Sequence, residues 1–246
     1  VSYSQFMQAA ARDLAMDLRI QYADHLAETT LAQAREALQG PGRPDYLVFV
    51  NEQYVAPEIL RLAQGSGVKL FMVNNALTPD QMSLLGSQPE KYPDWLGSLV
   101  PNDEEGGYLM LKELIRLHPP AAPGQVIELL AFSGLKVTPA AQLREKGMMR
   151  ALAEHPEVRL RQLVNGGWTR ERAFEQAGLL FKRYPKASLV WTANDEIAFG
   201  VMQAYAEAGG EPGKDALFGT INHSPAALRA LLDGRLSVLL GGHFSL

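Results

Sequence analysis

Hydrophobic residues recur along the chain in two alternating patterns: short apolar runs, and longer stretches in which apolar positions return every three or four residues. The first longer stretch predicts an amphipathic helix over residues 3–14. After it, the pattern predicts strands at 18–23, 46–50 and 68–73, with helices at 27–38 and 57–63. Strands that alternate with helices are typical of right-handed βαβ units and a parallel sheet.

The alternation stops after residue 75 and starts again at residue 126. Residues 76–93 contain Pro79, Pro89 and Pro93 and no clear period, which predicts a surface excursion. The remaining pattern predicts strands at 95–100, 126–132, 158–164, 188–192, 216–221 and 236–240, and helices at 104–117, 139–153, 170–184, 196–208 and 225–233. The proline-rich segment 118–124 is the strongest breaker of regular structure in the chain, whereas the handoff between the two blocks lies near residues 100–103.

Two blocks of the same alternation predict an α/β fold of two doubly wound parallel-sheet lobes joined by hinge strands. We assign residues 1–101 to the N-terminal lobe and residues 102–240 to the C-terminal lobe, with residues 241–246 returning toward the first lobe. Ligands of doubly wound sheets bind outside the carboxyl ends of the strands. The residues that follow each strand are therefore the candidate site.

Asparagine is frequent at these strand ends: Asn51, Asn74, Asn75, Asn194 and Asn222 all follow predicted strands. Each amide side chain offers two donors and one acceptor, which suits a neutral ligand with many hydroxyl groups. The alternative is structural, because asparagine tolerates turn geometry and caps helices. The sequence leaves both interpretations open.

The amino-acid composition argues against several classes of function. The chain of 246 residues has 23 Lys and Arg against 27 Asp and Glu, a formal charge of −4, which argues against a nucleic-acid partner. It has no cysteine, so disulfides, thiolate nucleophiles and Cys-ligated metals are excluded. The five histidines lack the spacing that places two ligands on one helical face. We therefore expect neither a metal nor another cofactor.

Catalytic motifs are also lacking in the sequence. There is no phosphate-binding Gly-x-x-x-x-Gly-Lys loop and no Gly-x-Ser-x-Gly nucleophile elbow. An enzyme would have to use His223 or His243 with Asp103 or Asp195, and their spacing does not make a nucleophile with its base. We expect a binding protein rather than an enzyme.

Two segments carry a family resemblance. Residues 189–209, with Asn194-Asp195 between a strand and a helix, and residues 218–236 resemble the type I periplasmic sugar-binding proteins, which share their fold with the effector domains of LacI-type repressors. The resemblance covers essentially the whole chain. It implies a periplasmic, monomeric solute-binding protein of an ABC importer, whose lobes close over a small neutral sugar-like or polyol ligand. The closed form would meet a membrane permease or receptor.

The resemblance also implies roles for individual residues. Asn194 or Asp195 would bind ligand hydroxyls, although Asp195 also suits a helix cap. Trp168 would lie against the apolar face of a sugar, or else pack on Phe174 or Tyr184. Arg170 would lie near the ligand or pair with Glu171. The expected ligand-binding set is completed by Asn51, Tyr54, Asn74, Asn75, Asn222 and His243.

The chain departs from the family pattern in two ways. Relatives begin with a strand, whereas this sequence opens on a helix, so we expect the first strand to be lacking. Amides at Asn74, Asn75 and Asn222 stand where relatives often have charged groups, which favours a less usual polyol or another neutral molecule. The alternative function is the effector domain of a repressor, or a sensor domain. A signal segment upstream of residue 1 would support the transport function, and a helix-turn-helix the repressor.

Overall fold

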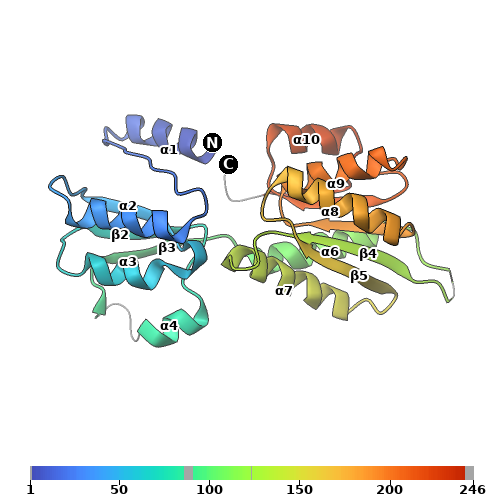
Figure 1. The fold of residues 1–246 in the computed structure, drawn as a ribbon, viewed down its shortest axis with the longest axis horizontal. Coiled ribbons are helices and arrows are strands. Elements are labelled where there is room, and N and C mark those ends of the chain that lie inside the picture. Colours follow the sequence, from blue (N-terminus) through green and yellow to red (C-terminus); the bar gives the residue numbers. More distant parts are fainter. Residues whose placement is uncertain (1, 86–90, 123, 242–246) are drawn as a thin grey trace. The chain divides into compact units, whose positions relative to one another are not determined.

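The computed structural model describes residues 2–85, 91–122 and 124–241 (Figure 1). They form two compact units, and the chain passes from unit 1 to unit 2 between Pro101 and Asn102. None of the described helices combines the length and apolar composition that a bilayer-spanning helix requires.

Unit 1 is built on a three-stranded parallel sheet in the order β1-β2-β3. Its apolar core lies on the side of the sheet that α2 and α3 cover, where Phe49, Leu70 and Met72 meet Leu38 and Ile59. The elements of unit 1 are α1 (Ser2–Asp13), α2 (Ala27–Gln39), β1 (Tyr46–Val50), the short 3-10 helix η1 (Glu52–Tyr54), α3 (Ala56–Ala63), β2 (Lys69–Val73), α4 (Pro79–Leu85) and β3 (Trp95–Leu99).

One strand prediction for unit 1 is wrong. Residues 18–23 are in neither a helix nor a strand, although their apolar positions alternate. Alternation only decides which side chains face the protein, whereas a strand also needs a neighbouring backbone to pair with. Here a groove of about 410 Å³ lies between this segment and the β1 edge. The predicted surface excursion contains helix α4, which begins at Pro79, a residue suited to a first helical turn.

Unit 2 has a five-stranded parallel sheet in the order β5-β4-β6-β7-β8 (Figure 1). From β4 the chain crosses to β5 on one side, and then returns to β6 on the other side. The switch point is therefore between β4 and β6. The elements of unit 2 are α6 (Asp103–Leu117), β4 (Ile127–Ser133), α7 (Pro139–Ala153), β5 (Val158–Asn165), α8 (Arg170–Arg183), β6 (Ala187–Thr192), α9 (Asp195–Glu207), β7 (Leu217–Ile221), α10 (Pro225–Leu232) and β8 (Val238–Leu240).

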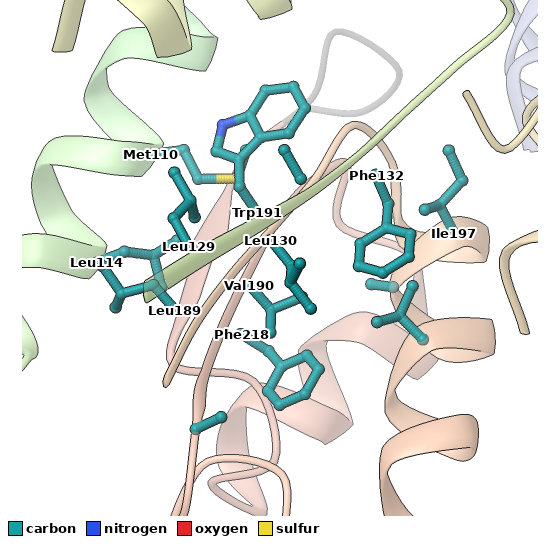
Figure 2. Close-up of a cluster of buried hydrophobic side chains, with 14 of the residues drawn as sticks. Met110, Leu114, Leu129, Leu130, Phe132, Leu189, Val190, Trp191, Ile197 and Phe218 are labelled. Carbon is teal, nitrogen blue, oxygen red and sulfur yellow. The ribbon is translucent and has the colours of Figure 1, made fainter. Parts of the chain in front are cut away.

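The core of unit 2 surrounds β4 and β6, which helices cover on both faces. Figure 2 shows Leu130 and Phe132 of β4 with Val190 of β6, and Trp191 of β6 pointing to the opposite side near Met110; all these side chains are fully buried. Strands buried on both faces consist of continuous apolar runs, which is why these two were predictable from sequence. The buried central strands give their carboxyl ends a fixed position.

Helices α6 and α7 approach each other at backbone distance. A Cβ added at Gly147 of α7 would lie 1.8 Å from the carbonyl oxygen of Glu104, and one at Gly107 of α6 would lie 2.0 Å from that of Arg144. Only glycine fits at these two positions. The crossing sets the relative position of the first turn of α6 and the middle of α7.

Replacement of Gly147 by alanine tests this crossing. Because the added methyl group would meet backbone atoms, we expect Gly147→Ala to lower the free energy of unfolding of unit 2 by about 1–3 kcal/mol. The matched control is Gly178→Ala in α8, where a Cβ would meet nothing within 4 Å. This control should raise stability by up to about 1 kcal/mol, because alanine is the better helix former. Urea denaturation followed by hydrogen exchange in β4 and β6 measures the free energy of unfolding of both variants. Equal changes in the two variants would contradict the close approach of α6 and α7 at Gly147.

Candidate functional site

The carboxyl ends of β4, β5, β6 and β7 bring polar residues together in unit 2. The amide of Ala193, after β6, donates to Phe132 O of β4 at 2.9 Å, and the amide of Gly166, after β5, donates to Ser133 O at 2.7 Å. Asn222, after β7, donates from Nδ2 to Asp195 Oδ1 at 3.4 Å. These bonds place the ends of four strands beside one another at the switch point of the sheet.

Asn194 and Asp195 follow Ala193, the first residue after β6, and have different roles. Asn194 is the N-cap of α9, and its Oδ1 accepts from the Ile197 amide at 2.9 Å. The helix begins one residue earlier than predicted, so Asn194 rather than Asp195 makes the cap. Capping uses Oδ1 of Asn194, which leaves Nδ2 as the atom that can donate to a ligand. Asp195 is buried in the first turn of α9 and accepts from Asn222.

Trp168 lies across the end of β4. It follows Gly166 and Gly167 and has a φ of 69°, a left-handed conformation that turns its half-buried indole toward Gly134. A Cβ at Gly134 would lie 2.2 Å from Cζ2 of the ring, so the absence of a side chain there makes room for the indole. The guanidinium carbon of Arg144 lies 5.7 Å from the ring centroid. The indole is therefore positioned at the switch point.

Arg144 and Asp103 belong to this region although the sequence analysis did not select Arg144. Arg144 Nε donates to Asp103 Oδ1 at 2.6 Å, and its Nη1 donates to Ala193 O at 2.6 Å. Burial raises the pKa of Asp103 above its usual value, while the charge and hydrogen bond of Arg144 act in the opposite direction. The available sequence signal was an arginine in the buried row of α7, in line with Ala141, Met148 and Ala151.

Two buried polar atoms at the strand ends have no partner among the described residues: Oγ of Ser133 and Oδ1 of Asn222. Ser133 is fully buried, and Asn222 has a φ of 81° that turns it back toward Asp195. Buried polar atoms in proteins are nearly always hydrogen-bonded, to protein or to another molecule. Four other side chains of the described chain, Glu52, His155, Arg161 and Gln176, also have such an atom, so this property alone does not mark a binding site. Ser133 is not among the residues that the sequence predicts for the site.

Four of the predicted site residues follow the strand ends of unit 2: Trp168, Asn194, Asp195 and Asn222. Arg170 lies on the surface of α8, with Nε 3.7 Å from Glu196 Oε2 and its guanidinium 4.9 Å from the Phe199 ring centroid. The observed acidic partner is Glu196 and not Glu171. His243 lies outside the described residues.

The other predicted site residues belong to unit 1. Asn51 is fully buried, and its side chain donates to Ala76 O and Gln81 Oε1 and accepts from the Ala56 amide. All its polar atoms are engaged inside the unit, so Asn51 has a structural position. The other three, which are partly buried and follow β1 or β2, are Tyr54, Asn74 and Asn75.

The chemistry available in unit 2 is that of a neutral polar binding site. It combines an indole face, amide donors, the Ser133 hydroxyl and the Asn222 amide oxygen. It also contains one buried ion pair, Arg144 with Asp103, whose opposite charges neutralise each other. In the part of the chain that the structure describes, no group of three or more His, Asp or Glu side chains is placed to share a metal ion.

Comparisons with known proteins show the family to which the chain belongs. The model of the family described as periplasmic binding protein domain matches residues 2–242. A periplasmic sugar-binding protein from Pseudomonas fluorescens has a crystal structure with 64% sequence identity and a TM-score of 0.89, over 99% of this chain and 70% of that chain.

Two further relatives are more distant. The galactofuranose-binding protein YtfQ of Escherichia coli is 32% identical over 115 residues, which span 46% of this chain and 35% of that protein. The arabinose transporter component of Shewanella sp. ANA-3, bound to L-arabinofuranose, is 21% identical with a TM-score of 0.80, over 96% of this chain and 73% of that chain, and shows the fold alone. Strand order, fold and family model all agree, and the chain belongs to the periplasmic binding protein domain family.

Proposed function

We propose that the protein is the sugar-binding component of an ABC importer and that unit 2 holds a small neutral sugar at the ends of β4 and β6. The observation that carries the proposal is the half-buried Trp168 indole across the end of β4, in the same unit as the Asn194 Nδ2 donor and the oxygen atoms of Ser133 and Asn222. A sugar presents an apolar C–H face and a rim of hydroxyl groups. The Trp168 indole suits the apolar C–H face. The oxygen atoms of Ser133 and Asn222 and the amide of Asn194 suit the hydroxyl groups.

The furanose form is the sugar class that we favour. The Escherichia coli relative is named for galactofuranose, and the Shewanella neighbour was solved with arabinofuranose. The resemblance also implies that the two lobes close over the bound sugar, and we include this closure in the proposal. Since relatives work outside the cytoplasm, we further propose a periplasmic location and a membrane permease as the partner. The sugar would be released unchanged, because binding and not conversion is the function.

A thermal-shift screen tests the sugar class. The panel is L-arabinose, D-galactose, D-fructose, D-allose and methyl β-D-galactofuranoside, with D-glucuronate as the charged control. A sugar at 100 times its dissociation constant stabilises the folded state by about 2.7 kcal/mol, so we expect a clear rise in melting temperature for at least one neutral sugar. Recovery of that sugar unchanged after incubation is part of the expected result. A response to glucuronate alone, or to no sugar, would contradict the proposal.

Replacement of Trp168 tests the aromatic contact. We expect Trp168→Ala to weaken binding of the responding sugar at least tenfold, which is about 1.4 kcal/mol, because the sugar face loses its apolar partner. The matched control is Trp95→Ala at the amino end of β3 in unit 1. This variant should keep the affinity, even if it lowers stability. Isothermal titration calorimetry measures both, and equal losses would count against the indole as the platform.

Ser133→Ala separates binding from stability. In the sugar-free protein the Ser133 hydroxyl is buried without a described partner, so its removal should leave the free energy of unfolding unchanged or slightly higher. Binding should weaken by roughly fivefold, about 1 kcal/mol, because a sugar hydroxyl loses its partner. Urea denaturation and calorimetry give the two values. A loss of stability with unaltered affinity would assign Ser133 to the core instead.

A further inference from the structure

The guanidinium of Arg144 joins three parts of unit 2. It contacts the first residue of α6 through Asp103, the loop after β6 through Ala193 O, and the indole of Trp168. The side chains of Arg144 and Asp103 are each only 4% exposed. Because both are removed from solvent, the guanidinium has few alternative positions while the carboxylate is in place.

The α6–α7 crossing holds this pair in contact. Gly147 follows Arg144 by three residues on α7, and its missing side chain lets the helix touch the backbone of Glu104, the neighbour of Asp103. Asp103 and Arg144 are 41 residues apart in sequence and meet only because of this crossing. The packing of α6 against α7 therefore determines the position of the Asp103 carboxylate, and the carboxylate in turn holds the Arg144 guanidinium.

Stability alone is a weak reason for such a pair. The cost of removing two charges from water often offsets their attraction, and a buried ion pair can be exchanged for apolar residues without loss of stability. Its geometry is specific, however. Two donors of the arginine fork are used by Asp103 and Ala193 O, and this holds the guanidinium near the Trp168 ring. Gly134, which has no side chain, allows the ring to lie against the backbone.

We propose that Asp103 is a positioning residue of the sugar site: it fixes Arg144 beneath Trp168 and thereby sets the position of the indole at the strand ends. This inference rests on the proposed function, since the indole is the surface that the sugar contacts. When the carboxylate is removed, Arg144 loses its anionic partner inside the protein and moves away from Ala193 O. The ring then loses its support on that side.

Fluorine NMR of protein labelled with 5-fluorotryptophan tests the position of the ring directly. The chain has three tryptophans, and Trp168→Phe identifies the Trp168 resonance. In the sugar-free protein, Asp103→Asn should shift or broaden this resonance and leave that of Trp95 in unit 1 unchanged. The same variant should bind the responding sugar of the screening panel at least tenfold more weakly.

The control is Glu154→Gln, which removes an exposed ion pair between the same two helices, formed by Lys112 and Glu154 at 2.9 Å. It should alter neither the Trp168 resonance nor the affinity. If Asp103→Asn does not fold, Arg144→Lys replaces it. Lysine keeps the charge but lacks the planar fork that reaches Asp103 and Ala193 O from two separate nitrogens, so the same resonance shift and loss of affinity are expected.

An unchanged Trp168 resonance in the folded variant would overturn the proposal, and so would a shifted resonance with full affinity. If no panel sugar binds the wild-type protein, the proposed function fails. The sugar-free spectra would then still decide whether Asp103 positions the indole.

Discussion

The strand order of unit 2 decides where its polar side chains can meet. The chain leaves β4 toward β5 on one side and comes back to β6 on the other, so the connections after β4 and β6 run in opposite directions. A crevice opens where such connections diverge. Apolar burial of both strands fixes their carboxyl ends, and the residues directly after them take their positions from the sheet. Every later feature of the candidate site depends on this arrangement.

The hydrogen bonds that a polar side chain makes within the protein then distinguish structural side chains from candidate binding side chains. Asn51 and Asn194 both follow strands, but Asn51 uses all its polar atoms within unit 1, whereas the cap made by Asn194 uses only its oxygen. Ser133 and Asn222 keep a buried atom without a described partner. The first kind of residue completes the fold. The second kind is the one that we propose for binding a molecule with hydroxyl groups.

Sequence patterns predicted the features that depend on local or topological rules. The strands of unit 2 follow from continuous apolar runs, and the positions of Trp168, Asn194, Asp195 and Asn222 follow from the rule that parallel strands end at one edge. Patterns failed where a feature depends on partners distant in sequence. Residues 18–23 alternate like a strand but lack a paired backbone in the described chain, and Arg144 meets Asp103 only through the glycine contacts between α6 and α7.

The central claim is that the ends of β4, β6 and β7 form the surface on which the sugar lies. A crystal structure of the protein with the sugar bound tests it most directly. The account predicts that the sugar ring lies against the Trp168 indole and that its hydroxyl groups bond to Ser133 Oγ and Asn222 Oδ1. A sugar bound elsewhere, with these two atoms still unpartnered, would contradict it.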